Sequence, residues 1–445
     1  MPVSKRGFAL GLTAIALAGF AIRVAFVVFS RVQHLPLGLG DSAFYSRGAN
    51  LLADGRGFID PFLLPAVRQS ADHPPLYTMW LAIPSFVWPG HAATPTVHMI
   101  WSCVLGAGTV AVCGLAGREI AGPRVGLLAA ALAAIYPNVW VHDGMLLSET
   151  AALFTTAVLL LFAYRFLHAP SGWRAAWLGL WCGLAGLARP ELVLALPLVL
   201  APLVLLRRDR PWKQRLLWLG AGTLATAICI GPWLGYNLSR FDRPVYMSDN
   251  FGSTLGAANC KATYYGADIG YKNYDCARVL AQHFTRTVPH WSTLDESERD
   301  FVFRKAALTY IKAHEQRVPF EVAARWVRIA GLYHPTQEID DNTFLLKQPE
   351  WLGYLLLVSY YVMAVLAIIG AVVMRRRSIA IWPLVAIPVI VLLSVAVTFA
   401  QTRYRAPAEI AFVLAAAVAI DAGITAVRRR SERVSEPELQ TVGSA

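Results

Sequence analysis

The sequence predicts an all-α polytopic membrane protein, from its composition and from the apolar runs that recur along it. Of the 445 residues, 56% are hydrophobic and only 15% are charged, and the mean hydropathy is +0.48. Soluble domains are typically about 45–50% apolar and about 25% charged. A water-soluble fold could not bury this much apolar surface, and a disordered chain would carry far less of it. The composition therefore excludes both classes.

About ten apolar runs approach the ~20 residues that a helix needs to cross a bilayer. They cover residues 7–30, 95–117, 123–141, 147–167, 172–188, 191–206, 214–237, 351–374, 378–399 and 407–427. A further apolar piece, 76–88, is too short to span and lies between two proline-containing turns, so we expect a re-entrant or interfacial helix there. The first run is long and carries Arg23, which distinguishes it from a cleaved signal peptide.

The net charge of +12 comes from 40 Lys and Arg against 28 Asp and Glu. Cytoplasmic loops of membrane proteins carry an excess of Lys and Arg. If the N-terminus is cytoplasmic, the short cationic clusters all fall on that side: they are Lys5, Arg6, Arg118, Arg124, Arg165, Arg174, the loop 207–215, residues 375–377 and the tail from 428. We therefore expect both termini in the cytoplasm, and we attribute the basic excess to topology and not to nucleic-acid binding.

This topology predicts four parts. Residues 1–237 form an N-terminal transmembrane module with a large outer loop, 31–94; residues 238–350, the only stretch of soluble-domain composition, form an extracytoplasmic domain; residues 351–427 form the C-terminal transmembrane helices; and 428–445 form a disordered cytoplasmic tail. Disulfides form outside the cytoplasm. Cys260 and Cys276 are the only cysteines of the 238–350 domain, so we expect them to pair.

Asp41 is the leading candidate for chemistry, because it follows the outer end of the first run and has apolar and aromatic neighbours. A carboxylate at the membrane surface can act as a general base toward an acceptor hydroxyl. The alternative is an N-cap for the helix expected after it. Tyr45, on the same stretch, either joins the site or faces solvent.

Three more outer acids and a histidine are candidates. His73, next to Asp72 and before two prolines, could orient a phosphate or a carboxylate, or could be an ordinary interfacial residue. Glu149 begins an apolar run, where an ionisable side chain is costly unless it has a partner. It either takes part in function or only favours the positive end of the helix dipole. Asp143, in the same outer turn, is open to both interpretations.

Three arginines stand on the outer side, against the charge bias of the rest of the chain: Arg189, Arg403 and Arg405. Arginine pairs bidentately with phosphate oxygens, so a shared anionic ligand would explain all three, together with Tyr404 between the last two. The alternative is that they reach lipid headgroups. Arg23, midway along the first run, should have an acidic or phosphate partner, because an unpaired charge there is costly.

Nucleotide and hydrolase motifs are absent from the sequence: it contains no P-loop, no HExxH and no GxSxG. It therefore shows no sign of handling a nucleotide in the cytoplasm, and any activated group must arrive in the membrane. The sequence requires no cofactor. No Cys/His spacing of a zinc site occurs, and a divalent metal has no support from the sequence.

Several of these residues together resemble a known family. They are Gly40, Asp41 and Tyr45 after the first run, His-Pro-Pro-Leu-Tyr at 73–77, Arg118 and Arg124 before Tyr136-Pro137, the outer Glu149, and Arg-Tyr-Arg-Ala-Pro at 403–407. The set resembles the GT-C membrane glycosyltransferases, in particular the bacterial family 39 or PMT-like group, which includes relatives of the lipid A aminoarabinose transferase. The resemblance is best over 7–200 and returns at 400–427.

The resemblance implies transfer of a sugar from a polyprenyl-phosphate donor to a lipid, glycan or protein acceptor, at the outer face of the bacterial cytoplasmic membrane. It implies that Asp41 is the acceptor-activating carboxylate, that Glu149 is the second outer acid, and that His73 is the histidine of the His-Pro-Pro motif. Asp41 is a single acid where some members have an adjacent pair, which makes metal dependence doubtful. The alternatives are a flippase or exporter of polyprenyl-linked sugars, which usually shows internal repeats that this chain lacks, and a glycan ligase or polymerase.

Overall fold

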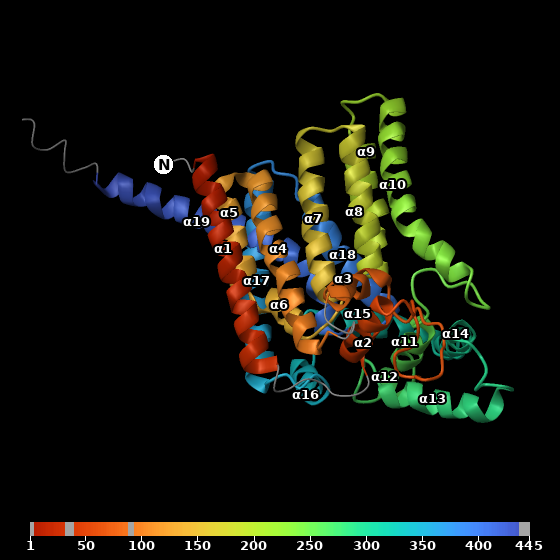
Figure 1. Cartoon of the computed structure of the whole chain (residues 1–445). Helices are drawn as coiled ribbons and strands as arrows, with labels where there is room; N and C mark the ends of the chain where they lie inside the picture. The colour runs from red at the N-terminus through yellow and green to blue at the C-terminus, as the bar shows by residue number, and fades with distance from the viewer. Residues whose placement is uncertain (1–3, 32–39, 88–92, 436–445) are drawn as a thin grey trace, which may run out of the picture.

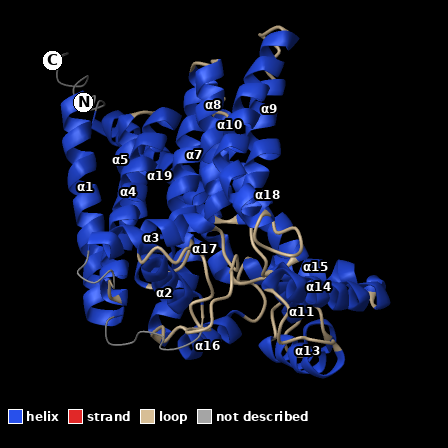
Figure 2. Ribbon diagram, turned by 45° about the vertical axis from the view of Figure 1, so that its right-hand side comes forward, coloured by secondary structure: helices blue, strands red, loops and turns tan. Residues whose placement is uncertain are grey.

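The structure, a computed structural model, describes residues 4–31, 40–87 and 93–435. Within these ranges the regular elements are helices, and the β pairing consists of one isolated bridge between Ile59 and Gln69 (Figure 2). The predicted all-α class is confirmed.

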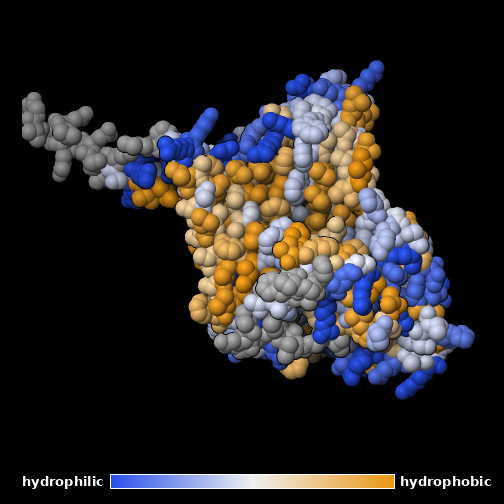
Figure 3. Space-filling model, viewed as in Figure 1, coloured by the Kyte–Doolittle hydropathy of each residue, from blue (hydrophilic) through white to orange (hydrophobic). Residues whose placement is uncertain are grey.

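Most of the long helices run side by side in one bundle (Figure 1). Its members are α1 (Lys5–Phe26), α4 (Pro95–Ala121), α5 (Pro123–Ile135), α7 (Glu149–His168), α8 (Gly172–Ala188), α9 (Ala201–Leu205), α10 (Trp212–Leu238), α17 (Glu350–Arg376), α18 (Trp382–Val397) and α19 (Ala406–Ser435). Apolar side chains cover the visible side of the bundle as a band, with polar residues above and below it (Figure 3). A band of this kind is the surface expected of a protein in a bilayer.

Every predicted run contains helix, but fewer than ten can cross a membrane alone. Six helices of the described residues are long and apolar enough: α1 with its continuation to Arg31, α4, α7, α10, α17, and α19 with the turn before it. A seventh span results if α5 and Pro137–Gly144 are taken together, although they are bent by 68°. The bend arises at Pro137, which lacks a backbone N–H and holds the residue before it in an extended conformation. The other predicted runs form shorter helices.

The cationic loops lie at one end of the bundle, and the two large segments between spans lie at the other (Figure 1). The second end carries α2 (Asp41–Ala53), α3 (Pro75–Val87), α11 (Phe251–Ala258), α12 (Lys261–Tyr265), α13 (Tyr274–Thr287), α14 (Glu296–Ala313), α15 (Val318–Ile329) and α16 (Pro335–Leu345). The short apolar helix expected at 76–88 is therefore present as α3. Cys260 and Cys276 form the expected disulfide, which joins the beginnings of α12 and α13.

The last helix is longer than expected. The tail 428–445 was predicted to be disordered, and this is wrong for 428–435, because α19 continues to Ser435. Arginine is a good helix former, and cations near a helix C-terminus interact favourably with the helix dipole. The rest of the predicted tail lies outside the described residues.

An ion pair lies inside the bundle. Arg23 is fully buried and its Nε donates to Asp143 at 2.7 Å, while its other nitrogens donate to the carbonyls of Gly19 and Ala133. A side chain at Gly106 would collide with Asp143, so the glycine leaves room for the pair. The expected acidic partner of Arg23 is thus Asp143, and both residues hold helices together.

Candidate active site

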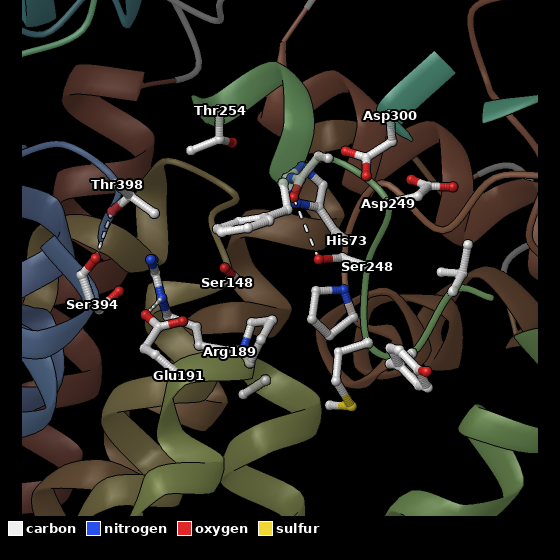
Figure 4. Close-up of a pocket in the computed structure, with 18 of the residues that line it drawn as sticks. His73, Ser148, Arg189, Glu191, Ser248, Asp249, Thr254, Asp300, Ser394 and Thr398 are labelled. Atoms are coloured by element: carbon white, nitrogen blue, oxygen red, sulfur yellow. Dashed lines mark hydrogen bonds and ion pairs between the residues drawn. The ribbon is translucent and has the colours of Figure 1, made fainter. Parts of the chain in front are cut away.

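A cavity of about 420 Å³ lies where the bundle meets the helices of the 238–350 segment (Figure 4). Its walls come from α2, the beginning of α7, the turn after α8, the segment 244–254, α14, the end of α18 and the turn before α19. It brings together seven of the residues predicted from the sequence: Asp41, Tyr45, His73, Glu149, Arg189, Arg403 and Tyr404.

Asp41 is the first residue of α2 and is not the N-cap of that helix. Gly40 is the N-cap, with φ of 140°, a conformation that glycine adopts far more readily than other residues. The carboxylate of Asp41 is therefore free for tertiary contacts. Its Oδ2 accepts from Arg403 Nη1 at 2.7 Å, and its Oδ1 lies 3.7 Å from Nε2 of His73.

His73 is held by aromatic rings beside this carboxylate. Its ring stacks on Tyr45 at 4.8 Å and meets Phe44 edge-on at 5.1 Å. Its Nε2 lies 3.2 Å from Asp72, which is not in the cavity wall and reaches the site through His73. Pro74 precedes α3 and Pro75 begins it, and the two prolines fix the backbone at this point.

These contacts determine the ionisation of Asp41 and His73. Burial alone would raise the pKa of Asp41, but Arg403 and His73 outweigh it and hold this pKa well below its usual value. Burial alone would lower the pKa of His73, and Asp72 and Asp41 instead raise it above its usual value. Asp41 is thus an ionised carboxylate at neutral pH.

The second acid, Glu149, has two arginine partners. It is fully buried, and its Oε1 lies 2.8 Å from Arg189 Nη1 and 3.8 Å from Arg403 Nε. Arg189 also bonds Glu191 at 2.6 Å, and its guanidinium lies over the ring of Tyr404 at 4.5 Å. These partners explain how an ionisable residue can begin an apolar span.

Three predicted site residues lie elsewhere. Arg405 was expected to bind phosphate, but it is buried away from the cavity, where it bonds Glu409 within α19 and donates to the carbonyl of Ile329 at 2.8 Å. Arg403 and Arg405 are two positions apart in a 3₁₀ turn, which directs their side chains to different sides. Arg23 and Asp143 form the pair described above and do not line the cavity.

The cavity also has an acidic side that the sequence did not indicate. In Figure 4, Asp249 and Asp300 lie on the side opposite Arg189 and Glu191. His73 lies between the two pairs. Both are almost fully buried, and burial, followed by the nearby Asp72, raises the pKa of Asp249 to about 7. In a polar segment with many charges, neither acid stood out. Glu191 could have been found as the neighbour of Arg189.

Removal of His73 tests this electrostatic arrangement. His73→Gln takes a cation away from Asp41, so the pKa of Asp41 rises, and the acid limb of the pH profile of kcat/KM moves to higher pH. His283→Gln, at an exposed position of α13, should leave the limb in place. An unchanged limb in His73→Gln would show that His73 does not set the charge of Asp41.

The arginines of the cavity disfavour a divalent metal beside Asp41 and Glu149. A metal site needs carboxylate oxygens that are free to coordinate. Here Asp41 and Glu149 are both engaged by arginines, whose positive charge disfavours a second cation. The acidic group with ligand-like spacing, Asp242, Asp295 and Glu298, lies outside the cavity, where Asp295 and Glu298 form the capping box of α14.

A family model matches part of the chain. Residues 72–236 match the family model described as dolichyl-phosphate-mannose-protein mannosyltransferase, a range that contains His73, Glu149 and Arg189. No curated protein sequence matches the chain.

Two solved structures of one archaeal protein show the same fold. The archaeal oligosaccharyltransferase AglB from Archaeoglobus fulgidus, with an inhibitory peptide and a dolichol-phosphate, is 13% identical, with a TM-score of 0.51 over 97% of this chain and 52% of its own. Its complex with Zn and sulfate is also 13% identical, with a TM-score of 0.52 over 97% and 51%. ArnT from Cupriavidus metallidurans, bound to undecaprenyl phosphate, is 14% identical, with a TM-score of 0.43 over 94% and 78%.

The chain spans about half the length of the two oligosaccharyltransferase chains. The family model, the helical fold and the apolar spans agree with one another. The PMT-like family model thus matches one part of the chain, and the chain shares the fold of the oligosaccharyltransferase AglB.

Proposed function

We propose that this protein transfers a sugar from a polyprenyl-phosphate donor to an acceptor at the outer face of the bacterial cytoplasmic membrane. One observation carries the proposal: an ionised carboxylate, Asp41, and two arginine forks, Arg189 and Arg403, line one cavity at the end of the bundle opposite the cationic loops. The first group suits activation of an acceptor, and the arginines suit a phosphate.

Each of the two arginines keeps N–H donors for a ligand, although both pair with acidic side chains. Among the described residues, Arg189 and Arg403 engage Nε and Nη1 with neighbouring side chains. The Nη2 of each guanidinium is therefore left to donate to phosphate oxygens. Arginine remains charged at any physiological pH, so this capacity does not depend on protonation.

The proposed step is a displacement at the anomeric carbon. The acceptor hydroxyl loses its proton to a carboxylate oxygen of Asp41, and its oxygen forms a bond to the anomeric carbon. The bond from that carbon to the phosphate oxygen breaks, and polyprenyl phosphate leaves with the electron pair. The negative charge that develops on phosphate is stabilised by Arg189 and Arg403.

The distribution of charge supports the proposed side of the membrane. The cationic loops lie at the end of the bundle opposite the cavity, and cytoplasmic loops are the ones enriched in Lys and Arg. We therefore place the cavity at the outer face and both termini in the cytoplasm. The acceptor is a lipid, a glycan or a protein.

A reconstituted transfer assay tests the proposal. Purified protein in liposomes receives a polyprenyl-phosphate hexose and an envelope extract as acceptor, and released polyprenyl phosphate is measured by mass spectrometry. Release that depends on both protein and acceptor is the expected result. Movement of intact donor between leaflets, without cleavage, would identify an exporter instead and overturn the transferase assignment.

A further inference from the structure

A buried lysine, Lys272, lies behind Arg403, one of the arginines that line the cavity. Lys272, in the link between α12 and α13, is only 5% exposed. Its Nζ donates to Gln401 Oε1 at 2.9 Å and to the hydroxyl of Tyr274 at 2.8 Å. Lysine is almost never fully buried unless it is paired. Among the described residues, Lys272 has no carboxylate at ion-pair distance, so its burial needs another explanation.

The lysine is connected to the site by a short chain of hydrogen bonds. Gln401 is almost fully buried, and its Oε1 accepts from both Lys272 and Arg403, whose Nε lies 3.1 Å away. Arg403 in turn donates to Asp41 at 2.7 Å. An amide turned the other way would present its NH₂ group to two cations, so Lys272 and Arg403 together fix which way Gln401 points.

The backbone around Gln401 is held as well. The carboxylate of Glu338 in α16 accepts from the hydroxyl of Thr402 at 2.7 Å and from its backbone N–H. The turn that carries Arg403 is therefore fixed from the 238–350 segment at two points, one at Lys272 and one at Glu338. Of these two, Lys272 is the one that acts through the side chain bonded to Arg403.

We propose that Lys272 is a positioning residue, which through Gln401 directs the Arg403 fork toward Asp41 and toward the phosphate of the donor. The proposal rests on the proposed function, because it takes the donor to be an anionic phosphate at Arg403. It assigns a role to a residue that does not itself line the cavity.

The groups that face Lys272 determine how it titrates. Burial, and then the positive charge of Arg403, lower the pKa of Lys272 to about 7, although Asp41, Glu338 and Asp341 act in the opposite direction. Tyr274 is its hydrogen-bond partner, and Tyr271 lies beside its ammonium group at 5.7 Å. Lys272 is therefore charged below about pH 7 and neutral above it. A phosphate at Arg403 would cancel that repulsion and raise the pKa, so that a proton is taken up on binding.

Affinity for the donor should then weaken as the pH rises from 6 to 9. The probe is undecaprenyl phosphate, titrated into the detergent-purified full chain at both values of pH. We expect Lys272→Met to weaken binding roughly tenfold or more at pH 6 and to change less with pH than the wild type. Lys272→Arg, with a permanent charge, should bind at pH 9 nearly as well as at pH 6. Lys305→Met, exposed in α14, is the matched control and should follow the wild type.

The phosphate of the lipid titrates in the same way for every variant. Differences in the pH dependence of affinity between the variants therefore report on Lys272. Proton uptake, measured by calorimetry of the wild type in buffers of different ionisation enthalpy, gives a readout that does not depend on how a variant folds. Wild-type binding with no proton uptake beyond that of the lipid, or Lys272→Met binding like the wild type at both values of pH, overturns the role of Lys272 alone. Failure of the wild type to bind undecaprenyl phosphate at any pH overturns the proposed function, and this role with it.

Discussion

Asp41→Asn should lower kcat for sugar transfer by roughly 10²–10⁴-fold, the usual contribution of a general base. The amide is nearly isosteric with the carboxylate and keeps an oxygen that can accept from Arg403, 2.7 Å away in the wild type. It cannot take the proton of the acceptor at neutral pH. Turnover is measured as release of polyprenyl phosphate, and donor binding is measured separately on the same preparation.

Donor binding should survive in Asp41→Asn, since both arginine forks remain in the cavity wall. Asp54→Asn is a suitable control, because Asp54 is exposed at the other end of the same helix, α2. Near-wild-type turnover of Asp41→Asn would show that another group takes the proton, and loss of donor binding would show that Asp41 supports the donor site instead.

Arg403→Met should weaken binding of the donor phosphate by about 1.5–3 kcal/mol, which is roughly 10- to 150-fold. The substitution removes the fork and leaves Asp41 and Glu149 with less positive charge beside them. Two carboxylates that face a phosphate repel it, so the loss of affinity has two causes. Binding of undecaprenyl phosphate to the purified chain is the measurement.

Arg403→Lys separates the two causes. Lysine keeps the charge but cannot offer a planar fork, so binding should lie between the wild type and Arg403→Met. Arg278→Met, at an exposed ion pair on α13, should bind like the wild type. Arg403→Met with wild-type affinity would mean that the phosphate is held elsewhere. Thermal stability is recorded in parallel, because Arg403 also joins the turn before α19 to α2.

The sequence predicted the fold class well because a bilayer restricts the available structures. Composition and run length led to an all-helical protein, and every apolar run contains helix. The number of full spans was overestimated, because prolines divide some runs. Pro137 bends one of them, and Pro190 opens a turn of irregular helix before α9.

The site was predicted in part, and the reason differs between residues. Asp41, Glu149 and Arg189 stood out because charge is unusual beside apolar runs. Arg405 stood out for the same reason, but only tertiary structure could show that its partner is Glu409. Lys272 lies in a polar segment where one more charge carries no signal, and its importance comes from contacts made across the fold.

The two groups of the proposed reaction belong to opposite ends of the chain. Asp41 and Arg403 are 362 residues apart in sequence. At a synthesis rate of about 5–20 residues per second, Arg403 leaves the ribosome roughly 20–70 s after Asp41. Until then Asp41 and Glu149 lack this arginine as a partner, and the cavity lacks one of its walls. Under the proposed function, a chain that ends before Arg403 would lack one of the two arginines that bind the donor phosphate.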